Sequence, residues 1–222
     1  MSAVRRRNPR AEARAQSQRE RILDAAQKCF IEHGFHGASM ATIAETADMS
    51  PGLMYRYFES RSAIVLAIIG RELEGKRAKI GELYTGADIV TRVLETFRQW
   101  QAGDPEAMNA ALFLEMTAQA TREPEIARAI RVSDKLTRRE FERWMCRPRE
   151  EGGLGFPKDV AQSRAILMQC LIEGLAVRAL RDPDLDARTL KGALEPLFLL
   201  LGLAQDDPPA RRVRAGTSGP SR

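Results

Sequence analysis

Two very short helices separated by a tight turn are the feature that most restricts how this chain can fold. Ser39 and Ser50 each precede a run with apolar residues at helical spacing, and Pro51 takes the first helical position after Ser50. The pattern predicts helices over 40–47 and 51–58, with only a few residues between them. Helices of this length are not stable alone, so both must pack against a longer neighbour.

A helix predicted over residues 17–33 supplies that neighbour. Ser17 and Glu20 form the pattern of a capping box, and Gly34 is the expected end. Apolar residues recur on one face of this helix and on the facing sides of the two short ones: Ile22, Ala26, Phe30, Ile43, Ala44, Ala47, Met54 and Phe58. Three helices with a short turn between the second and third form a helix-turn-helix, whose third helix enters the DNA major groove.

The rest of the chain also predicts helix. No sustained alternation of apolar and polar residues marks a strand, and the sequence has no Asn-Gly or Asp-Gly hairpin turn. Further helices are predicted over 61–83, 87–102, 105–121, 123–147, 158–181 and 187–204. The sequence thus predicts an all-α fold of about nine helices. Pro196 lies within the last of them, where it should kink the axis or mark a late start.

Basic charge is concentrated at the two ends of the chain. Residues 1–21 carry seven arginines against two glutamates, and 205–222 carry four arginines against two aspartates, within a net charge of +5. Neither end shows apolar periodicity, so a disordered basic arm is predicted over 1–16 and a disordered tail over 205–222. Between them lie the helix-turn-helix domain, 17–61, and a larger domain, 62–204. The basic arm suits a polyanion such as a nucleic acid backbone, but a solvated arm without a partner explains the charge equally well.

Several functional classes lack support in the sequence. No apolar run approaches the roughly 20 residues of a membrane-spanning helix, and the basic start is unlike a signal peptide, so a cytoplasmic location is expected. Cys29, Cys146 and Cys170 form no CxxC motif, so neither a disulfide framework nor a metal site is predicted. The absence of HExxH, GxSxG and phosphate-binding glycine motifs argues against an enzyme, and no cofactor is expected.

The stretch over 21–69 carries a dense pattern of motif positions. It reads RILDAAQKCFIEHGFHGASMATIAETADMSPGLMYRYFESRSAIVLAII. The pattern positions are Phe30, Gly34, Phe35, Ser39, Thr42, Ile43, Ala44, Ser50, Gly52, Tyr55, Tyr57 and Phe58. Through them the chain resembles the TetR/AcrR family of transcriptional regulators. It departs from the family at Arg61, where relatives carry lysine, and at Met40 and Ala41, where relatives often carry polar contact residues.

The resemblance implies an operator-binding surface built from the two short helices. Tyr55, Tyr57 and Arg61 are predicted to contact phosphates, with Ser39, Thr42 and Ser50 as supporting donors, and Pro51, Gly52 and Leu53 at the tip of the recognition helix. Arg56 is the candidate for reading a base, because a guanidinium pairs bidentately with guanine O6 and N7. Two alternatives stay open: Tyr55 is a core aromatic with its hydroxyl at the surface, or Arg56 contacts phosphate alone.

The resemblance also implies that 62–204 dimerises and holds a small-molecule effector. The predicted dimer interface comprises Val160, Leu167, Leu171, Gly174, Leu175, Leu190, Leu194, Leu197 and Leu201. The predicted effector contacts are Phe97, Trp100, Phe113, Met116, Trp144, Met145 and Met168. Few charges accompany the second set, which favours a hydrophobic or amphipathic effector. The alternative for both sets is plain intramolecular core.

These features together predict a homodimeric repressor that a small effector releases from double-stranded operator DNA. Effector binding between the middle helices would move the helix over 61–83 and change the separation of the two recognition helices. Repression, rather than activation, is an expectation from the family alone. The alternatives are a DNA-binding protein without a ligand, and an all-helical enzyme or small-molecule binder without DNA specificity.

Overall fold

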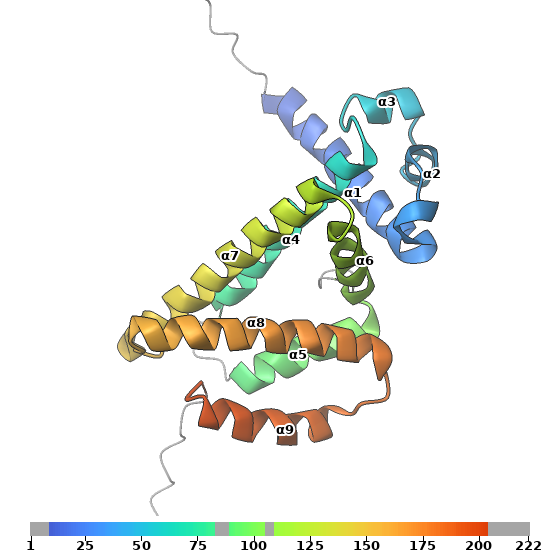
Figure 1. Ribbon diagram of the computed structural model, residues 1–222. Coiled ribbons are helices and arrows are strands. Elements are labelled where there is room, and N and C mark those ends of the chain that lie inside the picture. The colour runs from blue at the N-terminus through green and yellow to red at the C-terminus, as the bar shows by residue number, and fades with distance from the viewer. Residues whose placement is uncertain (1–8, 83–88, 105–108, 204–222) are drawn as a thin grey trace, which may run out of the picture.

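Every regular element in the described part of the chain is helical (Figure 1). The computed structural model describes residues 9–82, 89–104 and 109–203. Its helices are α1 (Pro9–Gly37), α2 (Met40–Thr46), α3 (Pro51–Tyr55), α4 (Arg61–Glu82), α5 (Ile89–Ala102), α6 (Ala110–Ala120), α7 (Pro124–Cys146), α8 (Lys158–Arg181) and α9 (Ala187–Leu200). A short 3-10 turn, Arg149–Glu151, lies between α7 and α8. The predicted all-α class is confirmed.

The first three helices form a small unit at one end of the molecule (Figure 1). Gly34 breaks α1 near its C-terminal end with a φ of 66°, a left-handed conformation that glycine adopts without strain. All the core residues predicted for the three helices are buried together, and later helices complete this core. Those helices contribute Ile64, Val65, Ile68 and Ile69 from α4, Leu112 and Met116 from α6, and Ile126 from α7.

A second core fills the unit formed by α5, α7, α8 and α9. Phe97, Met145, Met168 and Phe198 are its most deeply buried large side chains. In Figure 1, α4 and α7 run side by side from the first unit toward the second, and α8 crosses their far ends. The two units therefore share helices, because α4, α6 and α7 contribute residues to both cores.

The prediction that the first helix starts at Ser17 after a disordered arm is wrong, because the chain is already helical at Pro9. Residues 10–16 combine alanine with long charged and amide side chains, which favour helix. Nearly all of them are exposed, so they carry no apolar stripe that periodicity could reveal. The first eight residues of the predicted arm, and the predicted tail over 205–222, lie outside the described residues.

Other described helix ends agree with the predictions within a few residues, with two differences. α3 ends at Tyr55, three residues earlier than predicted, because the chain turns there and Phe58 packs into the first core. α9 continues through Pro196, so the predicted late start is wrong. Within the predicted helix over 105–121, residues 105–108 lie outside the described residues, and α6 begins at Ala110 after Asn109, whose side chain accepts a hydrogen bond from the Leu112 N–H at 3.0 Å.

Candidate nucleic-acid interface

Hydroxyl caps and a tight turn set the arrangement of α2 and α3. Ser39 Oγ accepts a hydrogen bond from the Thr42 N–H at 3.0 Å, and Ser50 Oγ accepts one from the Leu53 N–H at 3.3 Å. Between the helices, Asp48 has a φ of 49°, in the left-handed region that aspartate tolerates better than most residues. Both helices therefore begin at the caps that the sequence predicts.

α3 presents one side to solvent. Pro51, Gly52 and Arg56 are exposed, and Tyr55 keeps 53% of its surface accessible. The alternative that Tyr55 is a core aromatic is therefore wrong. Met54, by contrast, is fully buried and anchors the helix. A Cβ added to Gly52 would meet nothing within 4 Å, so the fold itself does not require glycine there.

The predicted DNA-contact residues fall into two groups by exposure. The exposed ones are Ser39, Ser50, Pro51, Gly52, Tyr55 and Arg56. The half-buried ones are Thr42, Leu53, Tyr57 and Arg61. All of them belong to α2, α3 or the chain that immediately flanks these helices. The second group is thus partly engaged in packing, and Tyr57 lies against the first core.

Two arginines of α1 hold the helix-turn-helix from within. Arg19 Nη1 donates to the Tyr57 carbonyl at 3.0 Å, and its guanidinium lies 4.3 Å from the centre of the Phe58 ring. Arg21 Nη2 donates to the main-chain oxygen of Asp48 at 3.1 Å and to its carboxylate at 3.0 Å. Both arginines belong to the basic cluster at the start of the chain. Part of that charge is therefore used to fix the turn and the end of α3.

Arg61 has a structural role that the sequence does not reveal. Its Nη1 donates to the carbonyl of Phe35 at 2.7 Å and to that of Ala38 at 3.4 Å. Its guanidinium also stacks over the Phe35 ring, 4.2 Å from the ring centre. Arg61 therefore secures the chain between α1 and α2. A phosphate contact through its other N–H groups stays a prediction.

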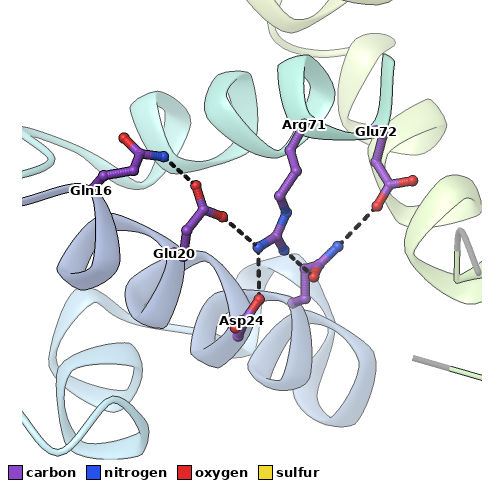
Figure 2. A network of polar contacts seen from close by, with 6 residues as sticks. Gln16, Glu20, Asp24, Arg71 and Glu72 are labelled. Carbon is purple, nitrogen blue, oxygen red and sulfur yellow. Dashed lines mark hydrogen bonds and ion pairs between the residues drawn. The ribbon is translucent and has the colours of Figure 1, made fainter. Parts of the chain in front are cut away.

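α4 is fastened to α1 by a polar network centred on Arg71 (Figure 2). Arg71 Nη1 donates to Asp24 Oδ1 at 2.6 Å and to Glu20 Oε2 at 3.2 Å, and Nη2 donates to Gln27. Gln27 in turn donates to Glu72 Oε1 at 3.1 Å. One guanidinium thus joins three side chains of α1, the helix that supports α3, to the helix that leads into the second unit.

Replacing Arg71 by methionine should lower the melting temperature by about 3–6 °C. Methionine keeps part of the apolar stem but removes every donor, and a half-exposed network of this kind contributes about 1–2 kcal/mol. Calorimetry of the full chain measures the shift. The matched control is Arg98→Met at an exposed position of α5, with an expected shift of about 1 °C or less. Equal shifts for both variants would mean that the network adds no stability of its own.

A cavity of about 230 Å³ lies among α4, α5, α6, α7 and α8. Trp100, Phe113 and Met168, three of the predicted effector contacts, line it. The other four predicted contacts, Phe97, Met116, Trp144 and Met145, do not line this cavity. Phe97, Trp144 and Met145 pack in the second core, and Met116 packs in the first. Helical periodicity marks an inward face, but it does not distinguish packed core from cavity wall.

The cavity lining is amphipathic. Its apolar and aromatic members are Ile80, Ile89, Val93, Trp100, Phe113, Phe141, Met168 and Ile172, and its uncharged polar members are Thr96, Gln99, Thr137 and Gln169. Arg92, Glu95, Asp134 and Glu173 also line it, so the cavity wall carries charges that the seven predicted contacts do not.

The last two helices expose large apolar side chains. Leu167 of α8 is 49% exposed, and Leu197 and Leu200 of α9 are 37% and 82% exposed. Leu167 and Leu197 belong to the predicted interface; of the remaining predicted residues, Gly174 is exposed and Val160, Leu171 and Leu201 are half-buried. Leu175, Leu190 and Leu194 are buried in the second core of the single chain, so little of their surface is open to a partner. The exposed positions that the prediction missed are Ile166, Leu180 and Leu199.

Within the described residues, α8 is one helix that is long and apolar enough to cross a membrane, by length and composition only. About 28% of the apolar 18-residue stretch of this helix is buried inside the protein. Ala161, Ala165 and Met168 supply part of that buried side, packed in the second core. The apolar composition of α8 therefore serves an inward face and an outward face at once.

A three-helix core, two hydroxyl-capped short helices and an exposed third helix define a helix-turn-helix DNA-binding protein. The family model "Bacterial regulatory proteins, tetR family" matches residues 22–68, and "BetI-type transcriptional repressor, C-terminal" matches residues 90–196. The chain belongs to the TetR family of transcriptional regulators.

The chain is similar to named regulators in sequence and in structure. It is 35% identical over 128 residues to the HTH-type transcriptional regulator UidR of Escherichia coli K12, a match over 57% of this chain and 63% of the relative. Salmonella enterica GusR has the same fold, with 28% identity, a TM-score of 0.65, and coverage of 82% of this chain and 95% of that one. A Saccharomonospora viridis regulator solved with choline also has the fold, at 19% identity, a TM-score of 0.64, and coverage of 83% and 96%. Both family models and the relative UidR are described as transcriptional regulators or repressors, not as enzymes.

Proposed function

We propose that this protein is a homodimeric, sequence-specific repressor that binds double-stranded operator DNA through α3. The observation that carries this proposal is the orientation of α3, which is anchored by buried Met54 while Tyr55 and Arg56 remain exposed. The caps at Ser39 and Ser50 leave helix N-termini near the surface, where phosphate oxygens bind. The protein would act in the cytoplasm, where its operator lies.

Selection of bound duplexes from a random DNA library tests this function. The purified full-length protein at near-physiological salt should enrich a two-fold symmetric site, with half-sites about one helical turn apart or a little more. Such a site would support both sequence reading and dimerisation. Recovery of no preferred sequence would leave only salt-dependent affinity for phosphates and would overturn the regulator proposal.

Arg56→Ala should relax base preference at one position in each half-site and weaken binding to the best site by about tenfold. A bidentate arginine–guanine pair supplies about 1–3 kcal/mol of discrimination, and alanine removes both donors without disturbing the buried side of α3. Repeating the selection with the variant measures the change. Tyr55→Phe is the comparison, because loss of a phosphate contact should weaken all sequences alike. An unchanged base preference in Arg56→Ala would support the alternative that Arg56 contacts phosphate alone.

The exposed apolar side chains of α8 and α9 support a homodimer. In Figure 1 these helices run antiparallel at the side of the molecule away from α3. Side chains such as Leu167 and Leu200 are costly to leave in water, and a second copy of the same surface would cover them. Two recognition helices held in this way can engage the two halves of one symmetric site.

The cavity is the proposed site of a small-molecule effector, and α6 is the element that couples it to DNA binding. Phe113 of α6 lines the cavity, and Glu115 of the same helix accepts a hydrogen bond from the Phe35 N–H at 3.1 Å. Phe35 also carries the stacked guanidinium of Arg61. An occupant that displaces Phe113 would therefore disturb the junction between α1 and α2.

The selected operator provides the readout for this coupling. A ligand that fills the cavity should weaken operator binding by about tenfold, within the usual range of coupling free energies. Tighter operator binding on ligand addition would reverse the proposed direction of control. Ligand binding without any change in operator affinity would favour a DNA-binding protein that no ligand regulates.

A further inference from the structure

We propose that the cavity selects a small amphiphile that offers an oxygen acceptor to the indole N–H of Trp100. This inference rests on the proposed effector role of the cavity and names the chemical class of the effector. It replaces the broad expectation of a hydrophobic or amphipathic molecule by a defined hydrogen-bonding requirement.

Two buried polar atoms of the cavity lining carry the inference. Trp100 and Thr137 are each 7% exposed, and both line the cavity. Within the described part of the chain, neither Trp100 Nε1 nor Thr137 Oγ1 has a hydrogen-bond partner. A buried polar group left without a partner costs about 1–3 kcal/mol, and native proteins satisfy most such groups. A cavity occupant that bonds to these atoms removes that cost.

Thr137 differs from other threonines in the described helices. The hydroxyls of Thr46, Thr96 and Thr117 each donate to the carbonyl four residues earlier, at 2.8–3.0 Å. That bond is the usual way in which a helix satisfies a threonine without a tertiary partner. Thr137 Oγ1 does not make it, although the residue lies within α7. Its hydroxyl therefore remains available to a group inside the cavity.

The chemistry of the lining defines the ligand. An indole N–H can only donate, so the ligand must present an acceptor to Trp100, whereas the Thr137 hydroxyl can accept or donate. Apolar and aromatic walls, including Phe113 and Phe141, suit a hydrocarbon or aromatic body. The cavity volume of about 230 Å³ lies just below the range of about 300–1,000 Å³ that is usual for ligand pockets, so the ligand is small.

A matched set of probes tests this inference on the full-length protein. The probes are 2-phenylethanol and propylbenzene, which share a phenyl ring and differ in that only the first carries an oxygen. NMR titration measures the affinity of each. We expect 2-phenylethanol to bind about fivefold to tenfold more tightly than propylbenzene, because only the alcohol satisfies the buried N–H of Trp100. Equal affinity of the two, or no saturable binding of the alcohol, would overturn the proposal.

Two tryptophan variants separate hydrogen bonding from general effects on the fold. Trp100→Phe keeps an aromatic ring but removes the donor, and should weaken 2-phenylethanol binding about fivefold to tenfold while leaving propylbenzene binding unchanged. Trp144→Phe is the control, because its Nε1 is equally unpartnered within the described residues but does not line the cavity. Equal losses of alcohol affinity in both variants would also overturn the proposal.

Operator binding in the same samples distinguishes this inference from the function on which it rests. If 2-phenylethanol binds with the expected dependence on Trp100 but leaves operator affinity unchanged, the ligand class stands and the effector role fails. If both probes release the operator equally in the wild type and in Trp100→Phe, the effector role stands and the ligand class is wrong.

Discussion

Leu167→Glu is expected to convert the dimer into monomers and to weaken operator binding by about a hundredfold or more. Leu167 is 49% exposed in the single chain, within the outward apolar side of α8. A glutamate there would place a charge against the same apolar surface of a second copy, where it has no partner. A monomer holds one recognition helix and loses the gain from binding two linked half-sites, which is typically a factor of about 10²–10⁴.

Analytical ultracentrifugation and fluorescence anisotropy on the selected operator measure the two effects. Val132→Glu is the matched control, because Val132 is 54% exposed on α7 and lies outside the proposed interface. That variant should stay dimeric and bind the operator normally. A dimeric Leu167→Glu variant with full operator affinity would place the dimer interface elsewhere on the molecule.

The sequence predicts the helix-turn-helix well because its signals are local. Ser39 and Ser50 cap the helices that directly follow them, and Met54 and Phe58 fall on the inward side by spacing alone. Each of these inferences needs only a few neighbouring residues. The start of α1 is missed for the complementary reason, because an exposed helical segment has no apolar periodicity.

The internal contacts of the site are not predictable in this way, because they join residues far apart in the chain. Arg19 bonds to Tyr57, and Arg61 bonds to Phe35, across tens of residues. In the sequence such arginines resemble free basic charge that awaits a phosphate. Only the folded arrangement separates them from Arg56, which is exposed.

The predicted effector contacts and the predicted dimer-interface residues agree least with the structure, because one apolar helix face has several possible partners. α9 buries Leu190 and Leu194 within the chain but exposes Leu199 and Leu200. Periodicity tells that a face is apolar, whereas the partner of that face is a property of the tertiary structure. The charged lining of the cavity is missed for the same reason, since its residues come from five different helices.

Gly153→Ala is expected to destabilise the fold by about 2–3 kcal/mol and to lower the melting temperature by roughly 5–10 °C. A Cβ at this position would lie 2.5 Å from the carbonyl carbon of Arg147 and closer still to its oxygen. That oxygen accepts a hydrogen bond from the Gly155 N–H at 2.8 Å. The added carbon would therefore clash with a backbone carbonyl that holds the loop by a hydrogen bond, and no side-chain rotation can relieve this clash.

The cost arises because this loop anchors the second core. Leu154, next to Gly153, is buried in that core, and the Phe156 N–H bonds to the Met145 carbonyl at 2.9 Å. A backbone shift at Gly153 would disturb both contacts. Calorimetry measures the change, with Gly70→Ala as the matched control. A Cβ on Gly70, in α4, meets nothing within 4 Å, so that variant should gain about 0.5–1 kcal/mol.

The same pair of variants separates stability from DNA recognition. The loop lies at the end of α7 away from the helix-turn-helix (Figure 1). At assay temperatures well below its lowered melting temperature, Gly153→Ala should therefore bind the operator with the affinity of the wild type. An unchanged melting temperature would mean that the loop relaxes around the added carbon at little cost. Lost operator affinity in an otherwise folded variant would mean that packing at this end of α7 reaches the recognition helix through α4 and α6.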